Sequence, residues 1–236
     1  MNTAAECLVA LRKASDSKQA KVLAGFFKTG KGQYGEGDAF LGLKVPQTRL
    51  IASQCRELPL PQVGRLLQSP FHEARLLALI VLVDRFERGE ATERQRIASF
   101  YVKNKSRINN WDLVDASAPY ILGPHIRESG REELRMTLAR SRKLWDRRLA
   151  MVSTFADLRA KDTGSVFRLA EMFLDDREDL MHKACGWLLR EAGKVDLAGL
   201  RAFLKKYSAT MPRTMLRYSI ERMTPTERRR WMDQAK

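Results

Sequence analysis

The sequence lacks the features that mark secreted and membrane-spanning proteins. Its first ten residues do not combine a basic start with a long apolar run, so no signal peptide is expected. The longest apolar stretch runs from Leu76 to Val83, which is too short to cross a bilayer and predicts a buried helix. We therefore expect a cytoplasmic protein with no membrane partner.

Cysteine and histidine are scarce, which argues against disulfide frameworks and metal sites. The three cysteines, Cys7, Cys55 and Cys185, are odd in number, far apart and without metal-ligand spacing. A reduced compartment is the default for such a chain. The three histidines are isolated in the sequence, and we interpret them as structural: His72, His125 and His182. No zinc-finger, P-loop or dinucleotide motif is present, so we expect no metal and no cofactor.

Positive charge, by contrast, is abundant. The chain has 43 Lys and Arg against 28 Asp and Glu, a formal net charge of +15 over 236 residues. Such an excess suits a polyanionic partner, with nucleic acid as the first candidate. A basic surface without a specific ligand is the alternative. Hydrophobic residues make up 44% of the chain, which is enough to build a sizeable core.

The hydrophobic pattern has helical periodicity almost throughout, and strand-like alternation is nearly absent. A Gly-rich stretch over residues 30–42 predicts the longest loop. The predicted helices cover residues 17–28, 46–56, 61–68, 71–87, 92–103, 112–122, 131–141, 144–159, 164–175, 178–194, 197–207, 212–223 and 226–234.

A weak internal repeat organises these helices. Apolar residues open four of them at intervals of roughly 36 residues, close to the period of HEAT-class helical hairpins. The repeat starts lie near Phe71, Ile108, Trp145 and Leu180. The repeat predicts an all-α, HEAT-like solenoid (an α-α superhelix) with a curved shape and a basic concave face. We expect one domain over residues 1–236, with the helices of residues 2–68 as an N-terminal cap.

The register of the repeat selects five residues. Trp111, Arg148 and Lys183 each lie three residues after a repeat start, and Asp115 and Trp187 lie one helical turn further on. Positions four apart share a helix face, and stacked repeats align equivalent positions. We therefore expect these side chains to converge on one surface. The alternatives are an ordinary ion pair between Asp115 and Arg148, and core roles for the two tryptophans.

This set of residue types suits cleavage of the glycosidic bond to a cationic base. A purine alkylated at N3 or N7 is positively charged and leaves readily, while its deoxyribose becomes oxocarbenium-like. Asp115 would stabilise that cation and orient the attacking water. Trp111 and Trp187 would flank the sugar and add cation–π attraction. Seven basic residues are predicted to bind DNA: Lys44, Arg49, Arg148, Lys183, Arg190, Arg213 and Arg217.

The chain also resembles a known family. Residues 110–115 (NWDLVD), 145–150 (WDRRLA), 183–191 (KACGWLLRE) and 40–46 (FLGLKVP) are similar to motifs of the AlkD-type DNA alkylation repair glycosylases. The resemblance implies a HEAT-like solenoid that holds duplex DNA and contacts the lesion's deoxyribose and backbone without a deep base pocket.

The resemblance also implies roles for single residues. Asp115 would be the catalytic carboxylate, Trp111 and Trp187 would pack against the lesion's sugar and backbone, and Arg148 would contact the backbone beside it. The chain departs from the family pattern at three places. Asn110 stands where an aromatic residue is common, Phe26 stands where tyrosine is common, and Lys44-Val45 replaces a more polar pair.

Two other functions stay open at this point. The first is a non-catalytic HEAT-like protein that binds damaged or branched DNA, since the wider superfamily includes such members. The second is a protein-interaction scaffold, which would need an exposed apolar groove in place of a basic one. For the glycosylase we expect a monomer that acts on double-stranded DNA containing alkylated bases, and that associates with the nucleoid if the source is bacterial.

Overall fold

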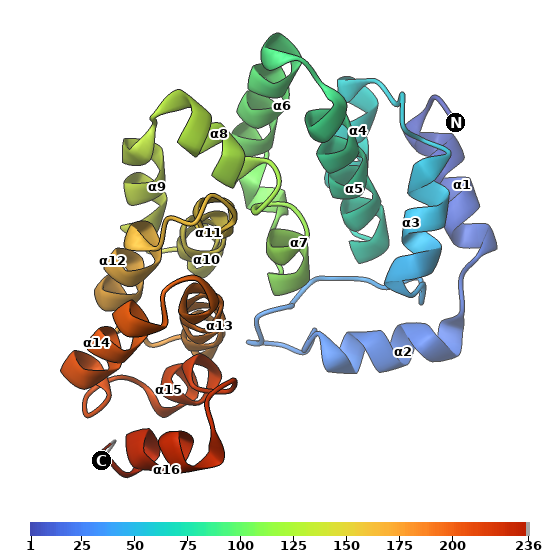
Figure 1. Ribbon diagram of the computed structural model, residues 1–236. Helices are drawn as coiled ribbons and strands as arrows, with labels where there is room; N and C mark the ends of the chain where they lie inside the picture. Colours follow the sequence, from blue (N-terminus) through green and yellow to red (C-terminus); the bar gives the residue numbers. More distant parts are fainter. Residues whose placement is uncertain (235–236) are drawn as a thin grey trace. The chain divides into compact units, whose positions relative to one another are not determined.

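The protein is built from helices. The computed structural model describes residues 1–234, and in this range the backbone forms helices, turns and one isolated bridge between Ala39 and Phe71. The all-α prediction is confirmed. The chain divides into two compact units, Met1–Ile121 and the part that begins at Leu122 (Figure 1). The single-domain solenoid stays a prediction.

The first unit contains seven α-helices and one 3₁₀ helix. In chain order they are α1 (Ala4–Lys13), α2 (Ser17–Phe26), α3 (Val45–Ser53), α4 (Leu60–Leu67), α5 (His72–Arg88), α6 (Ala91–Lys103), η1 (Lys105–Arg107) and α7 (Trp111–Asp115).

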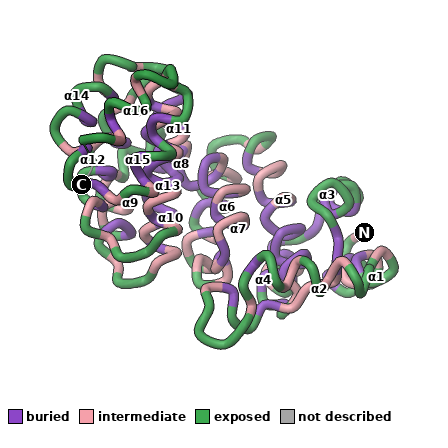
Figure 2. Tube along the Cα trace, turned by 90° about the horizontal axis from the view of Figure 1, so that it is seen from below, coloured by how far each residue is buried: buried purple, intermediate pink, exposed green. Residues whose placement is uncertain are grey.

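Helix α5 is the centre of the first unit. It is buried from His72 to Leu79 and contacts α3, α4, α6 and α7. Figure 2 colours the trace of the chain by burial. Helix α2 has no buried residue and runs across the direction of α3 and α5 (Figure 1). Between α1 and the end of α3, the Sγ atoms of Cys7 and Cys55 lie 3.1 Å apart in the core. These two cysteines are thus neighbours despite their separation in sequence.

The Gly-rich loop between α2 and α3, residues 27–44, is held by the start of α5. Its helix-free backbone confirms the loop prediction. The His72 N–H donates to the Ala39 carbonyl at 2.8 Å. The buried Glu73 carboxylate accepts hydrogen bonds from three successive backbone N–H groups, those of Leu41, Gly42 and Leu43. A charged acceptor strengthens each of these bonds, so the loop has a defined position over α5.

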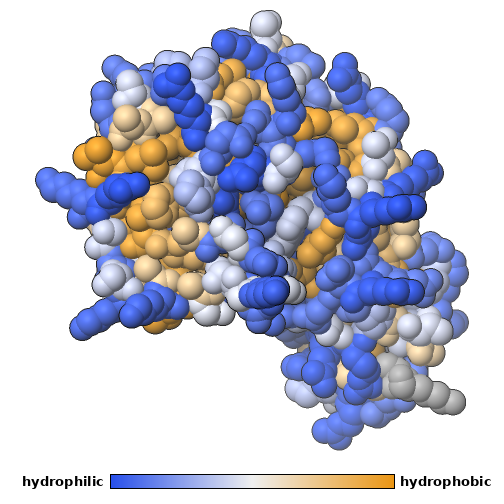
Figure 3. Space-filling model, turned by 180° about the vertical axis from the view of Figure 1, so that it is seen from behind, coloured by the Kyte–Doolittle hydropathy of each residue, from blue (hydrophilic) through white to orange (hydrophobic). Residues whose placement is uncertain are grey.

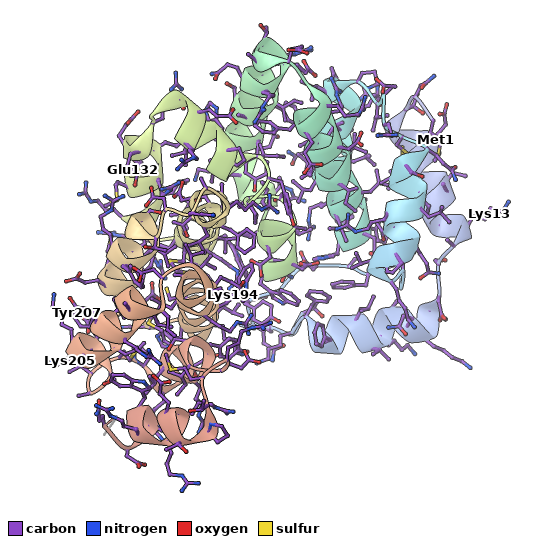
Figure 4. The ribbon with its side chains drawn as sticks, viewed as in Figure 1. Met1, Lys13, Glu132, Lys194, Lys205 and Tyr207 are labelled. Carbon is purple, nitrogen blue, oxygen red and sulfur yellow. The ribbon has the colours of Figure 1, made fainter. Side chains whose placement is uncertain are left out.

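The second unit contains nine α-helices in its described residues. They are α8 (Leu122–Ser129), α9 (Glu132–Ala139), α10 (Leu144–Ser153), α11 (Phe155–Arg159), α12 (Gly164–Met172), α13 (Asp179–Val195), α14 (Leu197–Tyr207), α15 (Arg213–Ser219) and α16 (Pro225–Gln234). Helix α13 is central: it contacts α10, α11, α12, α14 and α15. In Figure 4, Lys194 marks its last turn and Tyr207 the end of α14.

Gly186 sets the close approach of α13 to α15. A Cβ at this position would lie 2.5 Å from both the Met215 carbonyl oxygen and the Tyr218 Cβ. We expect Gly186→Ala to lower the free energy of unfolding by about 1–3 kcal/mol, because the two helices must separate. The control is Gly25→Ala in α2, where nothing lies within 4 Å of the added Cβ. That change should be neutral or slightly stabilising. Urea denaturation measures both, and equal stability of the two variants would contradict the prediction.

Two predicted helices were wrong in extent: one is shorter in the structure, and the other is divided into two. The helix expected over 112–122 ends at Asp115, and α8 begins at Leu122. Pro119 lies between them, and its ring disfavours helical backbone in the residue before it. The helix expected over 144–159 breaks between α10 and α11, where the Ser153 and Thr154 hydroxyls donate to carbonyls three residues back. Such bonds compete with the helical ladder.

The helices that open the predicted repeats lie close to their expected starts. They are α5, α7, α10 and α13, which begin at His72, Trp111, Leu144 and Asp179, each within three residues of the sequence-based start. This agreement of the helix starts supports the repeat register.

Candidate functional site

Helix α7 carries the two residues on which the sequence analysis centres. Trp111 opens this five-residue helix and Asp115 closes it, one turn further on. Both side chains are half-buried. Asn110 is the N-cap, and its side-chain oxygen accepts a hydrogen bond from the Trp111 N–H at 2.8 Å. The expected pairing of an indole and a carboxylate at positions four apart on one helix is thus present in the first unit.

Trp111 belongs to a group of aromatic rings contributed by the Gly-rich loop and the end of α2. The Phe27 ring stacks on Trp111 at 5.4 Å between centroids and on Phe40 at 5.0 Å. Phe40 in turn stacks on the His72 ring at 4.7 Å. Phe26 meets Trp111 edge-on at 6.0 Å and remains 62% exposed. The indole is therefore fixed on one side by rings.

A buried polar network lies beneath this aromatic group. Asp38, which is 9% exposed, accepts from the Arg75 Nη2 at 2.6 Å, from the Asn110 Nδ2 at 3.2 Å and from the His72 Nδ1 at 3.2 Å. The other ring nitrogen of His72, Nε2, lies 2.7 Å from the Asp112 carboxylate. The network thus joins the loop, α5 and α7.

The network shifts the pKa values of its members. Burial alone would lower the pKa of His72, but hydrogen bonds to Asp112 and Asp38 raise it to about 9. Burial would likewise raise the pKa of Asp38, but the hydrogen bond from His72 and the charge of Arg75 outweigh it and lower that pKa. At neutral pH the network therefore contains an imidazolium between two carboxylates, with a guanidinium beside Asp38.

Ala116, which follows Asp115, lines a cavity of about 370 Å³ within the first unit. Most of its other walls come from α3 and α5, including Arg49 and Asp84, and Arg56 and Tyr120 complete the lining. Arg49 is exposed. A cation predicted to bind DNA is thus near the helix that carries Asp115.

In the second unit, α10 and α13 carry the other three residues that the repeat register selects, Arg148, Lys183 and Trp187. Trp187 is half-buried, and its ring centroid lies 5.7 Å from that of Phe155. Arg148 is only 4% exposed, and its Nη1 donates to the Leu180 carbonyl at 2.5 Å. This contact links α10 to the first turn of α13. The convergence of these side chains with Trp111 and Asp115 stays a prediction.

The predicted DNA-binding cations have three kinds of environment. Arg148 is buried, while Lys183 pairs with Asp179 at 2.8 Å and Arg190 pairs with Glu191 and Glu221. The remaining four side chains are exposed: Lys44, Arg49, Arg213 and Arg217. Figure 3 shows many hydrophilic side chains projecting from one face of the molecule, with apolar patches between them. Phosphates would have to compete with carboxylates for Lys183 and Arg190. Arg213 is exposed but donates to the Met232 carbonyl at 3.1 Å.

Comparison with known proteins assigns the chain to a family. The model of the family described as DNA alkylation repair enzyme matches residues 8–223. The chain belongs to this family. That result confirms the resemblance seen in the four sequence motifs.

A solved structure agrees with the assignment. It is described as a predicted DNA alkylation repair enzyme from Enterococcus faecalis, with a TM-score of 0.70 over 89% of this chain and 97% of that chain. At 15% identity this likeness shows a shared fold. No curated protein matches. Among residues 1–234, no helix has the length and apolar character needed to cross a membrane, and no three His, Cys, Asp or Glu side chains form a metal-binding group.

Sequence reasoning missed the polar network under the site. His72 was interpreted as an isolated structural residue, and neither Asp38 nor Asp112 was singled out. The signal that was available is the adjacency of Asp112 to Trp111 inside the motif of residues 110–115. The partners of Asp112 lie on α5 and in the loop, which no local pattern connects to α7.

Proposed function

We propose that this protein is a DNA glycosylase that removes cationic N3- and N7-alkylated purines from duplex DNA. The observation that carries the proposal is the Trp111–Asp115 pair on α7, held against rings in a chain that belongs to the DNA alkylation repair enzyme family. An indole and a carboxylate one turn apart, both partly accessible, provide the groups that an oxocarbenium-like sugar requires.

In the proposed reaction the glycosidic bond breaks with both electrons moving to the base, which leaves as a neutral purine. Water then forms the new bond to C1′ of the deoxyribose and releases a proton. Asp115 stabilises the positive sugar, orients the water and accepts that proton before it passes to solvent. The leaving base needs no general acid because its positive charge already makes it a good leaving group.

The proposed function also includes the roles expected from the sequence for residues of both units. Trp187 would flank the sugar with Trp111, and Arg148 would contact the backbone next to the lesion. The basic residues Lys44, Arg49, Lys183, Arg190, Arg213 and Arg217 would bind phosphates on the concave face of a HEAT-like solenoid of one domain. Four of these side chains are exposed, and the other two, Lys183 and Arg190, form partly exposed ion pairs, which supports this role.

The direct test is release of bases from methylated duplex DNA. We expect the purified protein to release 7-methylguanine or 3-methyladenine, measured by chromatography against a no-enzyme reaction that corrects for spontaneous loss. DNA binding should weaken steeply as salt rises, because phosphate contacts release counterions. Salt-sensitive binding without base release would favour a non-catalytic DNA-binding protein. Absence of DNA binding at low salt would overturn both functions.

A further inference from the structure

Three segments that are distant in the sequence meet at the imidazole of His72. Its Nδ1 lies 3.2 Å from Asp38 of the Gly-rich loop, and its Nε2 lies 2.7 Å from Asp112 of α7. The ring is 2% exposed and is covered by Phe27 and Phe40. Because the two nitrogens contact carboxylates on different segments, the ring is a bridge between the loop and α7.

Helix α7 depends on such external contacts for its orientation. It has only five residues, and a helix of this length has little stability of its own. Asp112 is held at both oxygens: Oδ2 contacts His72, and Oδ1 accepts from the Leu113 N–H at 2.8 Å. Asn110, the N-cap of α7, is tied to Asp38. The Asp38–His72–Asp112 bridge is therefore one of the contacts that set the direction in which α7 presents Trp111 and Asp115.

We propose that His72 is a positioning residue: by bridging Asp38 and Asp112, it orients α7 so that Trp111 and Asp115 face the deoxyribose of the lesion. This role rests on the glycosylase function proposed above. His72 does not touch DNA, and it acts through the helix that does. A small displacement of a catalytic group is costly, since a misplacement of ~1 Å can reduce a rate by roughly 100-fold.

The bridge needs the charged form of the ring, because only an imidazolium donates from both nitrogens. The charged groups that surround it are Asp38 in the loop, Arg75 on α5 and Asp112 on α7. When the ring loses its proton, Asp38 keeps its bonds from Arg75 and Asn110. A neutral ring can donate to only one of the two carboxylates, so the bridge is broken at one end and the link between the loop and α7 through His72 is lost.

The test compares full-length wild type, His72→Gln and a control, His125→Gln, which removes a buried histidine of the second unit. We expect His72→Gln to lower the single-turnover rate of base release by about 10- to 100-fold, with the Kd for DNA changed by less than about 3-fold. The wild-type rate should fall as the pH rises through about 9, and this fall should be absent from His72→Gln. His125→Gln should retain both the wild-type rate and its pH profile. An unchanged rate in His72→Gln would overturn the proposal, as would an equal loss in the control.

A second variant and a second readout separate this proposal from the proposed function. Asp112→Asn keeps the shape of the side chain and should show the same rate loss. It replaces His72→Gln in the test if that variant does not fold. The indole N–H signal of Trp111, one of four tryptophans, can be assigned by Trp111→Phe and followed by NMR from pH 7 to 10. We expect it to shift with a midpoint near 9 in wild type and to show no such step in His72→Gln. No step in wild type would overturn the positioning role. A step without any base release would support that role and reject only the glycosylase.

Discussion

Asp115→Asn should lower the single-turnover rate of base release by roughly 100- to 1,000-fold while leaving the affinity for DNA close to that of wild type. Asparagine keeps the size of the side chain and one acceptor oxygen, but it lacks the negative charge that opposes the developing sugar cation. Removing one electrostatic group that faces transition-state charge has typical effects of this size. DNA affinity should persist because phosphate contacts, and not Asp115, supply most of the binding energy.

The experiment requires a measure of folding beside the rate. Asp115 is half-buried and lies near Tyr101. Burial raises the pKa of Tyr101, the hydrogen bond to Ser117 opposes this rise, and the charge of Asp115 adds to it. Because asparagine keeps the size of the aspartate side chain, a thermal melt of Asp115→Asn should stay near that of wild type. Glu57→Gln is the matched control, because this exposed carboxylate contacts only Arg88 among the ion pairs of the first unit. A wild-type rate in Asp115→Asn would reject the catalytic role.

The parts of the site that could be predicted are those that lie within one helix. Trp111 and Asp115 are four residues apart on α7, and the repeat register selects both positions from the sequence alone. Most helices could be predicted for the same reason, since 3.6-residue periodicity is a local signal. The end of α7 at Asp115 was missed although Pro119 is visible in the sequence, because an isolated proline also permits a kinked continuation.

The polar network could not be predicted, because its contacts connect residues more than 30 positions apart. In the sequence, Asp38 is an ordinary loop residue. Arg75 and His72 are both buried, but the hydrophobic stretch that follows Arg75 gives no sign that either side chain is a buried ion. Only packing brings Arg75 within 2.6 Å of Asp38 and aligns the imidazole with Asp112. Arg148 is a similar case in the second unit: the register selected it, but its burial and its bond to the Leu180 carbonyl are tertiary properties.

Asp38→Ala should lower the free energy of unfolding by about 3–5 kcal/mol at neutral pH, the largest stability effect that we predict. The change removes the acceptor for Arg75, His72 and Asn110 at once. Arg75 and His72 are each 2% exposed, so a guanidinium and an imidazolium would remain buried beside each other without that carboxylate. Breaking a buried pair in this way leaves an uncompensated charge. The control is Asp84→Ala, which removes a carboxylate that pairs with two arginines at a partly exposed position, where a loss of only ~0–1 kcal/mol is expected.

The pH dependence of this difference follows from the directions of the two shifts. The pKa of Asp38 is lowered in the folded state, so its stabilisation is present above the ordinary value of 3.8 and is lost as the pH falls through the lowered value. The pKa of His72 is raised, so its contribution is complete below 6.5 and is lost as the pH rises through about 9. Urea denaturation of wild type and Asp38→Ala across this range should show the largest difference between about pH 4 and 6.5. A difference that keeps growing above pH 9, or one no larger than that of Asp84→Ala, would show that the buried ions do not stabilise the loop and α7 together. If the difference follows the expected window, the Gly-rich loop and α7 are joined by charge, and α7 is held through Asp112 by a network whose other members lie outside the helix of Trp111 and Asp115.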